Sequence, residues 1–313
     1  MILKQLPEDF IVKEIPIYKF EKGNIPIFLL EKTNYPTEKA IQTIAKALNI
    51  PRKNISYAGL KDKRAITTQY ISIKDKPSRP EKLKLSDIKL THIGYLNKPL
   101  SLGELEGNEF QITVRNLPNK KFSHIELVPN YYDEQRFSEN NLEIGLAIIK
   151  KDYEKACEIL KQDDDKTQLK QWLDKHPSDF VNALKTIPIK ILQIYPRSFQ
   201  SHLFNLLVDR CIEKGLKNQE IPIPGFASEY CDVIRPLVEE LLEKYEISSR
   251  DFILRDFPRI SLEGAKRSIY VKPQGLSVKF EKDELNEGYK AIVNFKLAKG
   301  AYATNVVKHL FKK

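Results

Sequence analysis

Apolar and polar residues alternate in several short segments toward the N-terminus. The segments 10–13, 70–73 and 110–115 repeat every second residue, which is the period of a β-strand. Between the first two, a stretch that begins at Thr37 places its apolar residues on one face of a helix and stops before Pro51. We expect Thr37 to cap that helix, and the pattern predicts strands with a helix packed among them.

The middle of the chain changes to helix-length periods. The segments 144–160, 199–214 and 236–245 carry apolar residues at helical spacing. The charged stretch 74–82, with its prolines, and the acidic run Asp163–Asp165 are typical of solvated loops. We therefore expect a largely helical middle, and we interpret the acidic run as a loop rather than a metal site.

Strand periodicity returns toward the C-terminus, where 276–280 and 291–297 alternate and predict a hairpin. Strands at both ends of the chain around a helical middle indicate an α+β fold. We expect a discontinuous sheet domain, residues 1–147 and 259–313, that is interrupted by a mostly helical insertion domain at 148–258.

The 313-residue chain is strongly basic. It contains 52 Lys and Arg against 42 Asp and Glu, which gives a net charge of +10 and a pI of about 9.2. Such an excess favours a polyanionic partner such as a nucleic acid. A composition rich in lysine and glutamate is also typical of thermophile proteins, whose ion pairs need no ligand. The charge alone leaves both interpretations open.

Membrane insertion, secretion and metal binding find little support in the sequence. The apolar runs fall far short of the roughly 20 residues that a membrane-spanning helix needs, so we expect no membrane segment. The N-terminal residues lack the apolar region of a secretory signal, which favours a cytoplasmic protein. The 3 cysteines and 5 histidines show no paired metal-ligand spacing, and we expect no metal.

The segment Tyr57–Gln69 offers the clearest candidate chemistry. Asp62 follows Lys61 and precedes Lys63 and Arg64. This positive surrounding favours an ionised carboxylate that could serve as a nucleophile or a base. An aspartate in a charged turn is the plain alternative, and the local sequence does not decide between the two.

The same segment resembles the GxKDxxAxTxQ motif of the TruD family of pseudouridine synthases, and further blocks of that family follow in the same order along nearly the whole chain. The matching residues of the first motif are Gly59, Lys61, Asp62, Ala65, Thr67 and Gln69. The other blocks are KxxPEDFxVxE at 4–14, LGxLxGNxF at 102–110, PNYFGxQRFG at 129–138, RSxxxxLFN at 197–205, EGxxR at 263–267 and GSYAT at 300–304.

Three positions depart from the family pattern. Asp133 and Ser138 stand where the family commonly has glycine, and Ala301 stands where it commonly has serine. Because residues other than glycine tolerate a positive φ poorly, we expect the loop after Asn130 to differ in conformation from that of the family.

The resemblance implies a pseudouridine synthase catalytic domain with a mixed, mainly antiparallel sheet and an α/β insertion (TRUD) domain. It also implies a reaction without a cofactor, which breaks the N1–C1′ bond of a uridine and rejoins the uracil through C5. In this reaction Asp62 would act on the ribose as nucleophile or base, and Lys4 would pair with Asp62. The substrate would be tRNA, usually at uridine 13, and we expect the protein to be a monomer.

The resemblance also assigns residues to the substrate. Phe10 and Tyr302 match aromatic positions that receive the flipped base, and Asn130 matches a position whose amide contacts the uracil edge. The cations inside matched blocks would line an RNA-binding cleft and contact phosphates or ribose. These are Lys61, Arg136, Arg197 and Arg267. Taken singly, Phe10 and Tyr302 are better explained by core packing, Asn130 by a turn or a cap, and each cation by a surface charge.

Two other functions remain as alternatives. A noncatalytic RNA-binding protein would use the same positive charge and aromatic residues for phosphate contact and stacking, but it would have no need of Asp62 and Lys4. An RNA methyltransferase would normally carry a glycine-rich cofactor loop after a strand, and this chain has no GxGxxG motif among its 12 glycines.

Overall fold

The computed structural model describes residues 1–74, 80, 83, 85–137 and 140–312. Most of the loop expected at 74–82 lies outside these residues, as does Ser138, one of the three departures from the family pattern.

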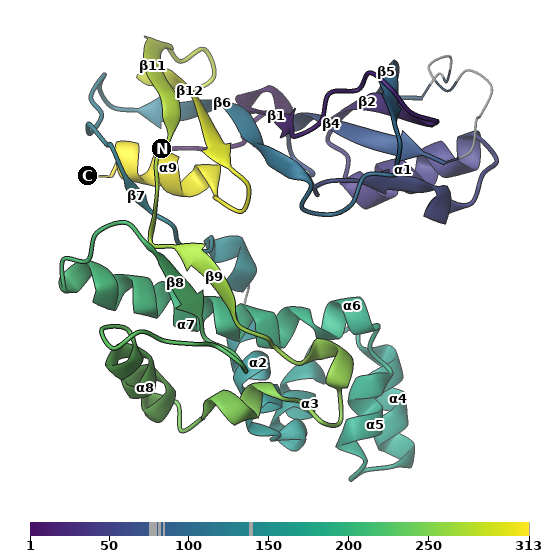
Figure 1. Ribbon diagram of the computed structural model, residues 1–313, viewed down its shortest axis with the longest axis vertical. Coiled ribbons are helices and arrows are strands. Elements are labelled where there is room, and N and C mark those ends of the chain that lie inside the picture. The colour runs from purple at the N-terminus through teal and green to yellow at the C-terminus, as the bar shows by residue number, and fades with distance from the viewer. Residues whose placement is uncertain (75–79, 81–82, 84, 138–139, 313) are drawn as a thin grey trace. The chain divides into compact units, whose positions relative to one another are not determined.

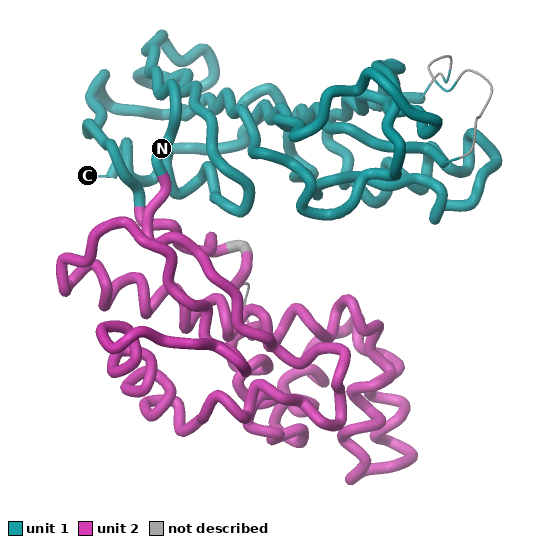
Figure 2. The backbone as a smooth tube through the Cα atoms, viewed as in Figure 1, with its two compact units in different colours: residues 1–128, 272–313 teal, residues 129–271 magenta. Residues whose placement is uncertain are grey.

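Two compact units divide the chain (Figure 2). The first comprises residues 1–128 and 272–313, and the second comprises residues 129–271. The second unit is larger than the insertion expected at 148–258, because it also contains the start of the helix Asn141–Lys150 and the two short strands Ala265–Ser268 and Tyr270–Val271. The assignment of 148–258 as a domain of its own stays a prediction.

The first unit is built on an eight-stranded sheet (Figure 1). The strands lie in the order β11-β12-β6-β1-β4-β2-β5, with β3 paired to β4. β1 runs parallel to β4, and every other neighbouring pair is antiparallel. The mixed, mainly antiparallel sheet that we expected is confirmed. The bounds are β1 Phe10–Pro16, β2 Ile25–Thr33, β3 Ile55–Tyr57, β4 Ile66–Ile73, β5 Ile88–Leu96, β6 Leu105–Leu117, β11 Gln274–Lys282 and β12 Tyr289–Ala298.

Helix α1, Thr37–Ala47, packs its predicted apolar stripe on this sheet. Ile41 and Ile44 are fully buried in one core with Phe28 of β2 and Ile71 of β4. The predicted cap is wrong, because Pro36 is the N-cap residue and Thr37 is the first residue of the helix. The Thr37 hydroxyl makes its hydrogen bonds with residues far away in the sequence instead of with its own helix.

The C-terminal segments complete the first unit. β11 and β12 form the predicted hairpin, and β12 adds to the sheet beside β6. Phe295 of β12 stacks on Phe110 of β6 with ring centroids 5.5 Å apart, and Phe110 meets Phe10 of β1 edge to face. The alternating apolar residues that predicted these strands therefore meet in one core. Helix α9, Ala303–Leu310, follows β12 (Figure 1).

A buried arginine joins distant parts of the first unit. Arg115 of β6 donates to Asp9 Oδ1 at 2.8 Å and to Asp283 Oδ1 at 3.0 Å, and all three residues are buried. The backbone of Arg115 also pairs with that of Ile2. Since an unpaired buried charge is costly, this cluster fixes the N-terminal segment on the sheet.

The second unit is largely helical, as predicted. The expected helix at 144–160 is two helices, because Lys151 adopts a left-handed backbone with φ 62° and Asp152 caps the next helix by accepting from the Lys155 amide. The helices are α2 Asn141–Lys150, α3 Tyr153–Leu160, α4 Thr167–Lys175, α5 Phe180–Lys185, α6 Ile189–Leu192, α7 Ile194–Glu213 and α8 Arg235–Lys244. β8, Glu220–Ile223, pairs antiparallel with β9, Ala265–Ser268.

Shorter elements complete the described chain. Two strands, β7 Val128–Pro129 and β10 Tyr270–Val271, form a pair of their own. Short 3-10 helices lie at Pro7–Asp9, Arg52–Asn54, Glu134–Phe137, Ser249–Phe252 and Pro258–Ile260. Of the helices in the described ranges, none is both long enough and apolar enough to cross a membrane.

Candidate active site

Asp62 and Lys4 meet because β1 and β4 are parallel neighbours in the sheet. Ile11 of β1 pairs with Ile66 of β4, so the segments that lead into these two strands reach the same end of the strand pair. Lys4 lies in one segment, and Asp62 lies in the other, the loop 58–65 between β3 and β4. Lys4 Nζ donates to Asp62 Oδ2 at 2.9 Å. The structure thus brings together the two residues that the resemblance assigned to catalysis.

The Asp62 carboxylate is accessible, whereas its partner is largely covered. The side chain of Asp62 is 42% exposed and that of Lys4 is 14% exposed. Lys4 adopts a left-handed backbone with φ 55°, a conformation that is uncommon outside glycine and is concentrated at functional sites. Lys4 Nζ lies 4.1 Å from the centroid of the Phe10 ring. Phe10 is buried and packs against the Lys4 ammonium. Its contact with a base therefore stays a prediction.

A buried polar frame fastens the loop that carries Asp62. Thr37 Oγ1 accepts from the Lys61 amide at 2.9 Å and donates to Gln69 Oε1 at 3.0 Å. Gln69 Nε2 in turn donates to the Gly59 carbonyl at 3.0 Å. Thr37 and Gln69 are buried, which shields these hydrogen bonds from water. The loop is therefore held at two points directly before Asp62.

Lys61 is turned into the protein. Its Nζ lies 2.5 Å from Glu14 Oε2, and the two side chains are 5% and 1% exposed. Gly59 makes room for this pair, because a Cβ atom there would lie 2.9 Å from Lys61 Nζ. A contact between Lys61 and RNA would require the pair to open, so that assignment stays a prediction. Sequence reasoning missed Glu14, although it is the last residue of the KxxPEDFxVxE block.

Asn130 and Arg267 are hydrogen-bonded to each other in the second unit. Arg267 Nη2 donates to Asn130 Oδ1 at 2.6 Å, and Arg267 Nε donates to the Asn130 carbonyl at 3.1 Å. Asn130 Nδ2 donates to the Ser268 carbonyl at 3.0 Å. Both polar ends of the Asn130 side chain are engaged and the residue is buried, so its contact with a uracil edge stays a prediction.

Two arginines of this unit lie against one aromatic ring. The guanidinium carbons of Arg267 and Arg136 lie 4.3 Å and 5.2 Å from the centroid of the Tyr132 ring. Arg136 Nε also donates to Ser201 Oγ at 3.1 Å. Arg197 is exposed on α7. These contacts orient two of the four cations that the resemblance assigned to RNA.

The sequence matches the family described as tRNA pseudouridine synthase D (TruD) over residues 1–172 and 219–310. This chain belongs to the TruD family. A probable tRNA pseudouridine synthase D 1 from Methanococcus maripaludis is 30% identical, over 99% of this chain and 99% of that protein. A probable tRNA pseudouridine synthase D from Methanosarcina mazei is also 30% identical, over 99% and 93%. As a TruD protein, the chain is an enzyme of the isomerase class.

A solved structure supports the same assignment. The crystal structure of a protein described as a tRNA pseudouridine synthase D from Methanosarcina mazei superimposes with a TM-score of 0.75 at 26% identity, covering 99% of this chain and 93% of that chain. The alignment with the Methanococcus maripaludis relative runs over 395 positions, more than the 313 residues of this chain. That relative therefore contains segments that this TruD protein lacks.

Residues of two further TruD motifs support the Asp62 loop and Tyr132 by hydrogen bonds. Gly103 of the LGxLxGNxF block donates its amide to the Ala58 carbonyl at 2.8 Å, at the start of the Asp62 loop. Asn205 of the RSxxxxLFN block accepts from the Tyr132 amide at 2.8 Å and donates to the Tyr132 carbonyl at 2.9 Å. Asn205 lies outside the residues that the family description matches, but it supports the ring on which Arg136 and Arg267 lie.

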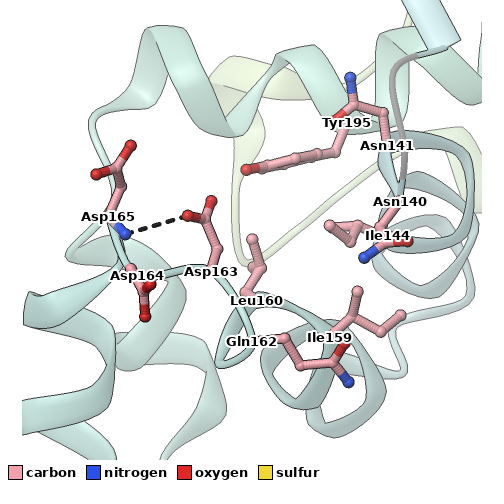
Figure 3. Close-up of a pocket in the computed structure, with 10 residues that line it drawn as sticks. All are labelled: Asn140, Asn141, Ile144, Ile159, Leu160, Gln162, Asp163, Asp164, Asp165 and Tyr195. Atoms are coloured by element: carbon pink, nitrogen blue, oxygen red, sulfur yellow. Dashed lines mark hydrogen bonds between the residues drawn. The ribbon is translucent and has the colours of Figure 1, made fainter.

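A cavity of about 660 Å³ in the second unit has a different character (Figure 3). It is lined by Asn140, Asn141, Ile144, Ile159, Leu160, Gln162, Asp163, Asp164, Asp165 and Tyr195. No residue assigned to catalysis or substrate is among them, and the three carboxylates repel phosphate. The acidic run lies in the predicted loop between α3 and α4, where Asp163 Oδ1 accepts from the Asp165 amide. The described ranges contain no cluster of His, Cys, Asp and Glu suited to a metal ion.

Proposed function

We propose that this TruD enzyme converts uridine 13 of tRNA to pseudouridine, with Asp62 acting on the ribose and without a cofactor. We further propose that it works as a monomer in the cytoplasm. The observation that supports this proposal most is the accessible Asp62 carboxylate, held 2.9 Å from the Lys4 ammonium on a loop with buried anchors.

The reaction is an isomerisation that such a site can support. The N1–C1′ bond breaks and a C5–C1′ bond forms, while C5 loses a proton and N1 gains one, so no atom is gained or lost overall. An ionised Asp62 serves either as nucleophile toward C1′ or as base toward the C2′ proton. The Lys4 ammonium stabilises the ionised carboxylate. Because the loop is anchored, the Asp62 carboxylate needs little reorientation to reach the ribose.

The other assigned residues would bind the substrate. Arg136 and Arg267, which are oriented by Tyr132 and Asn130, and the exposed Arg197 contact phosphates or ribose. Tyr302, at the N-terminus of α9, receives the flipped base together with Phe10, as aromatic side chains do for extruded bases.

Pseudouridine mapping on unmodified tRNA transcripts tests this function. The transcripts are incubated with wild-type protein that has been dialysed free of small molecules. We expect pseudouridine at one uridine, and none there in a control transcript that carries cytidine at that position. Binding of the transcript without any pseudouridine would favour the noncatalytic RNA-binding function instead.

A further inference from the structure

Lys32 is a fully buried lysine that contacts the Asp62 loop. It belongs to β2, only 1% of its surface is exposed, and it follows Phe28 and Leu30 on the core face of that strand. Lysine is almost never fully buried unless its charge is paired. Among the described residues, no carboxylate oxygen lies within ion-pair distance of Lys32 Nζ. Its hydrogen bond goes to the main-chain carbonyl of Asp62, at 3.0 Å.

Uncharged groups surround Lys32 on the strands beside it. Thr67 of β4 and Ile88 of β5 lie directly opposite Lys32 in the sheet. The Thr67 hydroxyl is buried and has no partner among the described residues. Gln69, the next residue on this face of β4, is engaged with Thr37 and Gly59. The neighbouring strands therefore provide no counter-charge.

The charged groups near Lys32 come from the loop and from β1. Glu14 of β1 forms an ion pair with Lys61, so Asp62 is the acidic group that acts on Lys32. Burial lowers the pKa of Lys32 to about 8, the negative charge of Asp62 raises it, and the positive charge of Lys61 lowers it. Lys32 is thus electrostatically coupled to Asp62 while it holds the same residue by its backbone.

We propose that Lys32 is a positioning residue of this enzyme, whose buried ammonium fixes the Asp62 backbone and aligns the Asp62 carboxylate with the ribose. The inference rests on the proposed role of Asp62. An apolar residue of similar length would fill the same space, and replacing buried charges by apolar groups is often neutral or stabilising. The fold alone therefore gives no reason for a lysine at this place, whereas the reaction does.

Lys32→Met tests the inference, with Lys89→Met as the matched control because Lys89 is an exposed lysine of the adjacent strand β5. We expect Lys32→Met to slow single-turnover pseudouridine formation by about 10- to 100-fold, as small displacements of a catalytic group do, while the tRNA dissociation constant and the Lys89→Met rate stay near wild type. A wild-type rate in Lys32→Met would overturn the inference.

The pH dependence of the rate separates positioning from a merely structural role. In the wild type the ammonium loses its proton as the pH rises through about 8, so the single-turnover rate should fall there, and Lys32→Met should lack this fall. If Lys32→Met does not fold, the wild-type profile alone tests the inference. A wild-type rate that stays level up to pH about 9 would contradict the coupling between Lys32 and Asp62. Wild-type protein that forms no pseudouridine at all would contradict the proposed function instead.

Discussion

At the scale of single residues, the site combines an accessible carboxylate with charges held inside the protein. Lys4 reaches Asp62 from the N-terminal segment, Lys61 is neutralised by Glu14, and Lys32 contacts the Asp62 backbone from the core. Each cation is fixed by a different partner, so together they define where the Asp62 carboxylate lies. Such preorganisation is what a reaction that depends on one carboxylate requires.

The buried charge of Lys32 should reduce stability. Its pKa is lowered from 10.5 to about 8 in the folded protein, so the folded state binds fewer protons than the unfolded state between these values, and stability rises with pH across that range. Below pH about 8 the full penalty is present, up to about 3 kcal/mol for a shift of this size. We expect Lys32→Met to be more stable than wild type at pH 7.

Denaturant unfolding of both proteins between pH 7 and 10.5 measures this difference. The advantage of Lys32→Met should shrink as the pH rises from about 8 toward 10.5, because the folded wild type then holds a neutral lysine and the free energy needed to remove the proton from the unfolded state falls. Equal stability of the two proteins at every pH would show that burying this ammonium carries no penalty. A variant that is both more stable and slower would show that the lysine serves the reaction at the expense of the fold.

At the scale of secondary structure, the site depends on how three elements meet. The parallel pairing of β1 and β4 brings Lys4 and Asp62 to one end of the strand pair. The first turn of α1 supplies Thr37, which fastens the loop between β3 and β4. The loop is thus anchored to a helix and to two strands, and its conformation should depend on all of them.

Thr37→Val should loosen this loop. The substitution keeps the shape of the side chain but leaves the Lys61 amide and the Gln69 amide oxygen without a partner, which costs about 1–3 kcal/mol for a buried group. We expect lower stability and slower pseudouridine formation. Thr43→Val is the control, because Thr43 lies on the same helix and its hydroxyl bonds to the Lys39 carbonyl and the Tyr35 hydroxyl, neither of which belongs to the Asp62 loop. The account would be contradicted if both variants formed pseudouridine at the same rate.

Much of this arrangement could be predicted from the sequence. Strands 10–13 and 110–115 and the C-terminal hairpin follow from alternation with a period of two, which is a local property of the chain. The family motifs singled out Asp62 and Lys4 before their contact was seen.

Other features could not be predicted, because they depend on partners far away in the sequence. Thr37 stands before a helical stretch as caps do, yet its hydroxyl bonds to Lys61 and Gln69. Lys32 follows an apolar run and would ordinarily be placed in solvent at the end of a strand. Only the folded chain shows that the Asp62 loop covers it.

At the scale of the whole molecule, positive charge should dominate the binding of tRNA. The chain carries a net charge of +10, and phosphate contacts release condensed counterions, so tRNA affinity should fall steeply as salt is raised. The arginines assigned to RNA lie in the second unit and the catalytic pair lies in the first. Binding and chemistry should therefore respond to different substitutions.

Arg197→Gln should weaken tRNA binding through a lost phosphate contact. We expect the slope of log affinity against log salt to become shallower by about 0.7–0.9, the value for one phosphate. Arg210→Gln is the matched control, since Arg210 lies on the same helix α7 but pairs with Glu240 at 3.0 Å. Binding curves at several salt concentrations measure both slopes, and an unchanged slope in Arg197→Gln would remove this residue from the interface.

The role of Asp62 is tested most directly by single-turnover pseudouridine formation with Asp62→Asn, measured alongside tRNA binding and the melting temperature. The substitution keeps the volume of the side chain and removes its charge, and the side chain is 42% exposed, so the fold and tRNA binding should stay near wild type. We expect the rate to fall by at least about 100-fold, while the exposed control Asp164→Asn keeps full activity. Pseudouridine formed by Asp62→Asn at the wild-type rate would contradict the account.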